Sequence, residues 1–284
     1  MLIGLTIVAF GTSSPEAAVS INASLKNSNE IAIGNIIGSN IFNILLVVGI
    51  ASIIRPINIK LKTILKEFPF MILATIVLFI LVNDVALQDY STNKISQGDG
   101  LILLSIFGVF LYYLVEMAFL SKEVDRRDLS NDSKSLTLPK SIVYGFIGLI
   151  GIIIGADFVV KSSSSIAIEL GLSETLVGLT IVAIGTSLPE LVTSIVAAYR
   201  GQSDIALGNA IGSNLFNILL VLGISSVIHP IIIEDKIILD IGFLLGATII
   251  SYIIATTKRS STRLEGAFLI ILYICYMAFI IIRK

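Results

Sequence analysis

The sequence has one cysteine, one histidine and few charged residues, and each scarcity excludes a class of protein. A single cysteine, Cys275, provides neither a disulfide framework nor a thiolate metal site. A single histidine, His229, gives no basis for a serine–histidine or cysteine–histidine nucleophile. Charged residues make up 14% of the 284 residues, whereas soluble globular domains average about 25%. A soluble enzyme is therefore excluded.

The chain is rich in apolar residues instead. Hydrophobic residues make up 55% of it and the mean hydropathy is +0.98, which is more apolar surface than one soluble core can bury. The formal net charge of −1 offers no basic surface for nucleic acid. The composition indicates an all-α polytopic membrane protein whose main surroundings are the lipid bilayer.

Nine apolar segments approach the roughly 20 residues that a helix needs to cross the hydrocarbon core of a bilayer. The two-residue alternation of a transmembrane β-barrel is not found in these segments, so helices are the expected spanning structure. The predicted helices cover residues 2–25, 30–54, 66–88, 98–121, 141–165, 174–198, 204–228, 237–257 and 264–282.

A polar connector at 122–140 divides the chain into a half of four helices, 1–121, and a half of five, 141–284. About two thirds of the 19 Lys and Arg residues fall on the side of the membrane that holds this connector. The positive-inside rule then predicts a cytoplasmic linker and a C-terminus on the outer side. The predicted location is the inner (plasma) membrane of a prokaryotic cell.

An internal repeat dominates the sequence. Residues 4–57 and 178–231 align without a gap, and roughly 34 of the 54 positions are identical. Because five predicted helices separate the two starts, the copies are expected to cross the membrane in opposite directions. Inverted repeats are typical of secondary transporters, with the binding site where the repeats meet. A helix precedes the second copy but not the first, so the first of an expected ten helices is predicted to be missing.

Each copy carries a GTSxPE motif inside an apolar helix. The proline clashes with the carbonyl four residues before it, which frees the carbonyls of Gly11 and Gly185. A carboxylate at the centre of a membrane costs at least about 2.5 kcal/mol and by default marks function, so Glu16 and Glu190 are the leading candidate ligands. The neighbouring hydroxyls either join the same site or bond back to their own helix; they belong to Thr12, Ser13, Thr186 and Ser187.

A second motif, GNxIGSNxFN, follows in each copy. Its serine and last asparagine are four residues apart and share a helix face, so Ser39 with Asn43, and Ser213 with Asn217, could complete the site. Small residues spaced in this way usually mediate helix packing, and packing is the interpretation favoured for the glycines Gly34, Gly38, Gly208 and Gly212. For Asn35 and Asn209 the packing and binding interpretations stay equally open.

Other polar residues point less clearly to function. Asp157 is predicted to pair with Lys161, four residues later on the same helix. Glu116 and Asp240 lie near helix ends, where a solvated or snorkelling role is expected. A set of carboxylates, hydroxyls and amides without sulfur or imidazole suits hard cations such as Ca²⁺ and Na⁺.

At these residues the sequence resembles the cation/calcium exchanger superfamily, and it is most similar to the prokaryotic sodium/calcium exchangers. The resemblance implies ten helices in two inverted halves, with ions held between the repeats. It implies that Glu16 and Glu190 are shared ligands, that the four hydroxyls assist them, and that Ala9 and Ala183 add backbone carbonyls. Ser39 and Ser213 would serve flanking Na⁺ positions, and Asn43 and Asn217 the centre. Some family members have Asp where this chain has Asn217.

The predicted function is a secondary active antiporter, not an enzyme, that exchanges Ca²⁺ for Na⁺ by alternating access and needs no cofactor. One alternative is H⁺/Ca²⁺ or K⁺-dependent exchange, and another is an inactive shortened product that lacks the first helix. An intramembrane enzyme that uses Ser13 or Ser187 is disfavoured, because the sequence duplicates every candidate residue whereas a nucleophile and its base form an asymmetric pair.

Overall fold

Helices make up nearly all of the regular structure in the computed structural model, which describes residues 4–88, 90–125 and 171–283 and isolated positions between 143 and 169. Residues 126–140 of the predicted linker lie outside the described residues. So does most of the predicted helix 141–165, including Asp157 and Lys161.

The first repeat folds into short helical segments that change type along the chain. A turn at Ser13 divides the first predicted helix, whereas the second continues from Asn29 to Ile54. With η denoting π-helix, the segments are η1 (Gly4–Val8), α1 (Ala9–Thr12), α2 (Ser14–Leu25), α3 (Asn29–Ile41), η2 (Phe42–Val47) and α4 (Val48–Ile54).

The second repeat folds in the same way, and its π segments fall at positions equivalent to those of the first. Helices α10 and α11 meet at a bend of 42° around Ser187. The segments are α9 (Glu174–Val177), η4 (Gly178–Val182), α10 (Ala183–Thr186), α11 (Leu188–Tyr199), α12 (Ser203–Leu215), η5 (Phe216–Val221) and α13 (Leu222–Ile228). π-Bulges of this kind occur often at functional sites.

The remaining helices follow the two repeats. They are η3 (Thr63–Glu67), α5 (Phe68–Leu81), α6 (Asp84–Gln88), α7 (Gln97–Asp125), α14 (Asp235–Lys258) and α15 (Arg263–Ile282). The predicted helix 66–88 is thus interrupted after Leu81, and its last part forms the separate helix α6.

Four two-residue strands, which the hydropathy pattern does not predict, join the loops. They are β1 (Ile57–Asn58), β2 (Lys94–Ile95), β3 (Ile231–Ile232) and β4 (Ser260–Ser261). Strand β1 pairs antiparallel with β4, and β2 pairs antiparallel with β3. Because each pair takes one strand from each half of the chain, both pairs tie the halves together.

Six described helical segments are long and apolar enough to cross a membrane, and the bent pair that begins at Glu174 would make a seventh. The chain is therefore a predominantly helical membrane protein, and the total of nine spanning helices stays a prediction. The six segments are Asn29–Ile54, Thr63–Leu81, Gln97–Phe119, Ser203–Ile228, Asp235–Lys258 and Arg263–Ile282.

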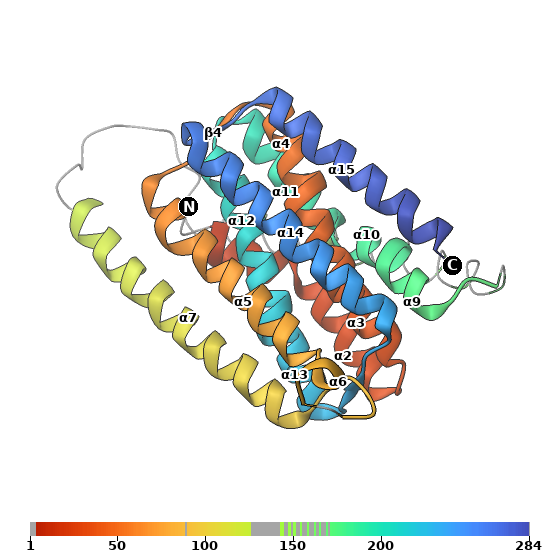
Figure 1. Ribbon diagram of the computed structural model, residues 1–284. Helices are drawn as coiled ribbons and strands as arrows, with labels where there is room; N and C mark the ends of the chain where they lie inside the picture. Colours follow the sequence, from red (N-terminus) through yellow and green to blue (C-terminus); the bar gives the residue numbers. More distant parts are fainter. Residues whose placement is uncertain are drawn as a thin grey trace.

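The two repeats run through the bundle in opposite directions (Figure 1). Helix α3 begins where α13 ends, because the Asn29 amide nitrogen lies 3.2 Å from His229 Nδ1 and donates to the Pro230 carbonyl at 3.3 Å. Helix α12 begins where α4 ends, because Asp204 forms an ion pair with Lys60. The bundle therefore has a His229 end and a Lys60 end.

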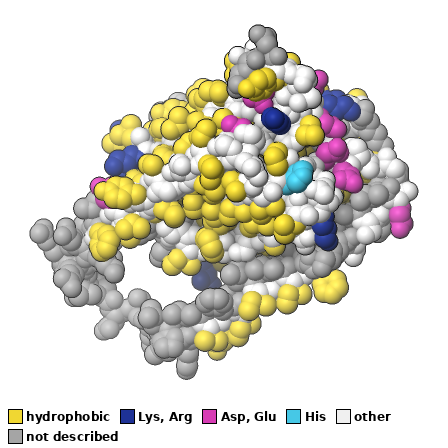
Figure 2. Space-filling view, turned by 90° about the horizontal axis from the view of Figure 1, so that it is seen from below, with side chains coloured by type: hydrophobic (Ala, Val, Ile, Leu, Met, Phe, Trp, Pro, Cys, Tyr) yellow, Lys and Arg dark blue, Asp and Glu magenta, His cyan; other side chains and the backbone are white. Residues whose placement is uncertain are grey.

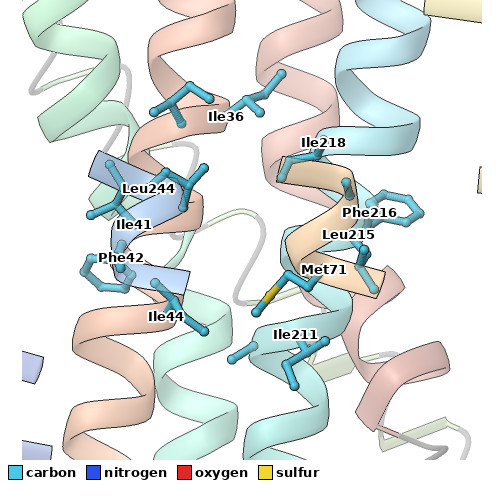
Figure 3. Close-up of a cluster of buried hydrophobic side chains, with 14 of the residues drawn as sticks. Ile36, Ile41, Phe42, Ile44, Met71, Ile211, Leu215, Phe216, Ile218 and Leu244 are labelled. Carbon is cyan, nitrogen blue, oxygen red and sulfur yellow. The ribbon is translucent and has the colours of Figure 1, made fainter. Parts of the chain in front are cut away.

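The repeats form the centre of the bundle and α5 and α14 pack beside them. Helix α3 packs against α14, and α12 packs against α5. The buried cluster of Figure 3 includes Phe42 of η2, Leu244 of α14, Met71 of α5 and Leu215 of α12. Buried apolar side chains therefore surround the polar motif residues of the repeats.

The outer surface is apolar over wide areas. Figure 2 shows hydrophobic side chains across much of one face, with the single histidine beside acidic side chains toward one edge. Tyr112 and Val115 of α7, and Ile271 and Ile274 of α15, are exposed. Cys275 is exposed on the same helix. Such a surface is stable in contact with lipid tails.

The predicted solvated role of Asp240 is wrong. The side chain is fully buried rather than solvated, and its Oδ2 accepts a hydrogen bond of 2.8 Å from Arg283 Nη2 in an ion pair. The partner lies at the far end of the next helix, so the pattern around Asp240 alone gives no sign of it. A second buried carboxylate, Glu67, accepts a hydrogen bond of 3.2 Å from the Tyr113 hydroxyl.

Candidate functional site

The site is built around two helix breaks at equivalent places in the repeats. Helices α1 and α10 end at Ser13 and Ser187, whose backbone angles are nearly the same, with φ −81° and ψ 5° in one and φ −87° and ψ 5° in the other. Pro15 and Pro189 lie in the first turn of the helices that follow. Each break therefore brings a serine and, three residues later, a glutamate to the same depth in the bundle.

The two breaks interlock across the repeats. The Ser13 hydroxyl donates a hydrogen bond of 2.9 Å to Glu190 Oε1, and the Ser187 hydroxyl donates one of 2.8 Å to Glu16 Oε1. All four side chains are fully buried. Each carboxylate is thus held by the opposite copy, and neither serine bonds back to its own helix as the alternative interpretation required.

Close contact between the copies depends on two glycines. A Cβ atom added to Gly38 would lie 2.6 Å from Ala183 Cβ, and one added to Gly212 would lie 2.7 Å from Ala9 Cβ. Real Cβ atoms do not approach so closely, so only glycine allows α3 to cross η4 and α10, and α12 to cross η1 and α1. The predicted packing role of these two glycines is confirmed.

The crossing brings the motif serines to the site. Ser39 Oγ lies 3.4 Å from the Ala183 carbonyl and 3.4 Å from Thr186 Oγ1. In the other copy the Ser213 hydroxyl donates to Glu190 Oε1 at 3.2 Å. The serines of the second motif therefore contact groups of the first motif in both copies.

The threonine hydroxyls contact both their own helix and the opposite copy. Thr12 Oγ1 lies 3.0 Å from the Val8 carbonyl and 3.1 Å from Asn209 Oδ1. Thr186 Oγ1 lies 3.0 Å from the Val182 carbonyl and 2.9 Å from Asn35 Oδ1. Each threonine hydroxyl therefore lies within hydrogen-bonding distance both of a carbonyl of its own helix and of an asparagine of the opposite copy.

Several buried polar atoms of the site lack a hydrogen-bond partner within the described part of the chain. They are Oε2 of Glu16 and of Glu190, and both amide atoms of Asn43 and Asn217. Buried polar groups nearly always bond to something. The segment that holds Asn43 packs against α11, and the segment that holds Asn217 packs against α2. The unpaired carboxylate and amide oxygens are accordingly suited to bind a cation, and the amide nitrogens could donate to its water.

All twelve predicted site residues lie in the interior, and none is more than 4% exposed. The set combines two carboxylates, hydroxyls, amides and two backbone carbonyls, which is a donor set for hard cations. Its members are Glu16, Glu190, Thr12, Thr186, Ser13, Ser187, Ala9, Ala183, Ser39, Ser213, Asn43 and Asn217.

Sequence reasoning missed two serines next to the site. Ser20 and Ser194 are fully buried and accept hydrogen bonds from the Asn35 and Asn209 amides. Each lies four residues after a site glutamate, on the same helix face, and each is a serine in both copies. That spacing is the signal that could have identified them.

Comparisons with known proteins relate the chain to membrane exchangers and their relatives. The family described as "Sodium/calcium exchanger protein" matches residues 1–116 and 140–282. The sodium/calcium exchanger MaX1 of Methanosarcina acetivorans is 31% identical, over 97% of this chain and 87% of its own length. The inner membrane protein YrbG of Escherichia coli is 36% identical, over 81% of this chain and 70% of its own length.

A solved structure agrees with these relatives. The sodium-calcium exchanger NCX_Mj, soaked with Na⁺ and Sr²⁺, superposes with a TM-score of 0.78 at 32% sequence identity. The match covers 98% of this chain and 86% of that one. Sequence and fold therefore lead to the same group of proteins.

Proposed function

The chain belongs to the sodium/calcium exchanger family, and from this we propose that it is a secondary active antiporter that exchanges Ca²⁺ for Na⁺ across a membrane. The observation that carries the proposal is the interlocked pair of buried glutamates. A carboxylate in the interior of a membrane protein is costly unless it is paired with a cation or a proton. Within the described part of the chain, the Glu16 and Glu190 carboxylates accept hydrogen bonds from serine hydroxyls, which leave both negative charges available to a cation.

The charge of the site suits an exchange between these two ions. Two carboxylates neutralise one Ca²⁺ or two Na⁺. The twelve predicted site residues, called the cage below, can therefore hold either one Ca²⁺ or two Na⁺ at the same net charge. The oxygen-only donor set favours both ions over softer metals. The names of the relatives MaX1 and NCX_Mj, both sodium/calcium exchangers, support the choice of Na⁺.

The ligand roles proposed here are those that the resemblance to the sodium/calcium exchangers implies. Glu16 and Glu190 are the shared ligands, and Ser13 and Ser187 hold them across the repeats. The hydroxyls of Thr12 and Thr186 and the carbonyls of Ala9 and Ala183 complete the cage. Ser39 and Ser213 serve flanking Na⁺ positions, and Asn43 and Asn217 the centre.

The opposite directions of the two repeats support alternating access. In the nine-helix arrangement, halves 1–121 and 141–284 present one cage to the two sides of the membrane in turn. The excess of Lys and Arg on the side of the Lys60 end supports a cytoplasmic position for that end. The printed description of the Escherichia coli relative as an inner membrane protein supports that membrane for this chain.

Flux measurements test the proposal. The purified protein is reconstituted into liposomes loaded with Na⁺ and then diluted into Na⁺-free buffer containing ⁴⁵Ca²⁺. Uptake that depends on the outward Na⁺ gradient is expected, and liposomes with equal Na⁺ on both sides are the control. Glu190→Gln, which keeps the size of the side chain but removes its charge, is expected to abolish uptake without preventing folding.

Two results would contradict the proposal. Uptake driven by a pH gradient, with no response to Na⁺, would mean that protons replace Na⁺ as the exchanged ion. Full exchange by Glu190→Gln would mean that the ions bind elsewhere in the protein.

A further inference from the structure

Asn35 connects the two halves of the cage without being one of its expected ligands. It lies on α3 and is fully buried. Its Oδ1 accepts a hydrogen bond of 2.9 Å from the Thr186 hydroxyl of the other repeat. Its Nδ2 donates to Ser20 Oγ at 2.9 Å and lies 3.4 Å from the backbone carbonyl of Glu16. One amide therefore joins a threonine of one repeat to the glutamate helix of the other.

Asn209 makes the equivalent contacts in the second copy. Its Oδ1 lies 3.1 Å from Thr12 Oγ1, and its Nδ2 lies 3.3 Å from Ser194 Oγ and 3.4 Å from the Glu190 carbonyl. The same three kinds of partner thus recur at both positions. An asparagine can hydrogen-bond across packed helices for stability alone, but here both copies place the amide between a threonine hydroxyl of the first motif and the backbone of a site glutamate.

The chemistry of the two groups explains what this arrangement achieves. A threonine hydroxyl has one hydrogen and two lone pairs. If the hydrogen of Thr186 is donated to Asn35 or to the carbonyl of Val182, the oxygen has only lone pairs left for a cation. The two amide donors of Asn35 are directed to Ser20 and the Glu16 carbonyl, so the amide oxygen must face the threonine.

We propose that Asn35 and Asn209 are positioning residues that hold Thr186 and Thr12, respectively, with their hydroxyl oxygens directed at the bound cation. The inference rests on the proposed function, because the cation is the one that Glu16 and Glu190 would bind. The same contacts would also make cation affinity depend on how the helices are positioned. A shift of α10 relative to α3, or of α1 relative to α12, would turn the threonine away and weaken the site.

A double-mutant cycle separates positioning from packing. Asn35→Ala, Thr186→Ala and the double variant are purified in detergent, and the Ca²⁺ concentration that gives half of the maximal thermal stabilisation is measured for each. Loss of a group that orients a metal ligand typically costs 10- to 100-fold in affinity. Each single variant is expected to lose about tenfold or more, and the double variant no more than Thr186→Ala alone.

The pseudo-symmetry of the fold supplies a matched control. Thr12 is an equivalent threonine that contacts Asn209 and not Asn35. In the pair Asn35→Ala with Thr12→Ala, the two losses of affinity are expected to multiply, as they do for residues that share no contact. The reciprocal cycle with Asn209→Ala and Thr12→Ala serves if Asn35→Ala does not fold, with Thr186→Ala as its control partner.

The possible outcomes separate failure of the positioning role from failure of the proposed function. If the losses multiply in the Asn35–Thr186 pair as they do in the control pair, the asparagines act by packing and the inference is overturned. Single variants that bind Ca²⁺ as tightly as the wild type would overturn it too. If the wild-type protein itself shows no stabilisation by Ca²⁺, the proposed function fails, and the inference fails with it.

Discussion

Ser13 donates a hydrogen bond of 2.9 Å to the carboxylate of Glu190, which lies 177 residues later in the chain. A hydrogen bond to a charged group contributes about 1.5–3 kcal/mol. We therefore expect Ser13→Ala to weaken Ca²⁺ binding roughly tenfold or more, because it removes a donor that holds Glu190 across the repeats. The measurement is the Ca²⁺ concentration for half-maximal uptake into proteoliposomes.

The neighbouring serine provides the control for this prediction. The Ser14 hydroxyl donates to the Phe10 carbonyl of its own helix at 3.0 Å, away from the cage. Ser14→Ala is the same substitution one residue further on, and it should leave the half-maximal concentration within a factor of two. Equal effects of both variants would mean that Ser13 acts only through the local helix.

Gly38 should not tolerate even one added carbon. Its Cβ would lie 2.6 Å from Ala183 Cβ, so Gly38→Ala must push α3 away from α10. Overpacking of this kind costs about 1–3 kcal/mol, and the shift also displaces the Ala183 carbonyl. We expect a lower midpoint of thermal unfolding and a loss of exchange.

Gly108 is the matched glycine for that experiment. It lies within the long helix α7, and a Cβ added there meets nothing within 4 Å. Alanine is a better helix former than glycine by up to about 1 kcal/mol, so Gly108→Ala should keep or raise the unfolding midpoint. Exchange by Gly38→Ala at the rate of Gly108→Ala would rule out the steric argument.

The two ends of the bundle differ in charge at positions that the repeat makes equivalent. Asp204 pairs with Lys60 at one end. The equivalent Glu30 and Glu234 at the other are both acidic, and each has an Oε2 within 3.4 Å of the Thr175 hydroxyl. Lys60→Glu makes the ends alike. We expect it to lower, at low ionic strength, the half-maximal Ca²⁺ concentration on the Lys60 side, because negative charge concentrates cations locally.

Salt and a nearby lysine check the electrostatic cause. Surface charges are screened beyond about 10 Å at 0.1 M salt, so the effect of Lys60→Glu should shrink as salt is added. Lys62→Glu makes the same change of charge two residues away, where the side chain lies near the Tyr113 ring rather than near Asp204. An equal effect of Lys62→Glu would assign the change to net charge alone.

Arg283 balances the buried charge of Asp240. The Asp240 side chain is 0% exposed and the Arg283 side chain 16% exposed. Removal of one partner of a buried ion pair typically costs about 3–5 kcal/mol. Arg283→Met should therefore lower the unfolding midpoint strongly, and adding Asp240→Asn should restore part of the loss because it removes the unpaired charge. A double variant no more stable than Arg283→Met would contradict this account.

The repeat made much of the site predictable from the sequence. An identical motif at two positions makes chance unlikely, and a glutamate in an apolar helix is informative because it is costly. For this reason residue type and spacing predict Glu16, Glu190 and their flanking hydroxyls as candidate ligands, and the structure brings these residues together in the interior. What the spacing cannot give is the partner, and the bonds from Ser13 to Glu190 and from Ser187 to Glu16 depend on how the copies cross.

Other features lay beyond the sequence for physical reasons. The change from α- to π-helix at Phe42 and Phe216 lies within a continuous apolar run, and hydropathy has the same pattern in either helix type. The pairing of Asp240 with Arg283 joins two helices whose relative position the sequence does not state. The two-residue strands are too short to produce a periodic signal.

The interlock between the repeats makes the protein resemble an internal dimer whose interface is also the proposed binding site. The same hydroxyls and carboxylates that hold the halves together are the groups proposed to hold the cargo. At these residues a substitution is therefore expected to change stability and affinity together. A substitution that bound the halves more tightly at Glu16 or Glu190 would do so in competition with the ion.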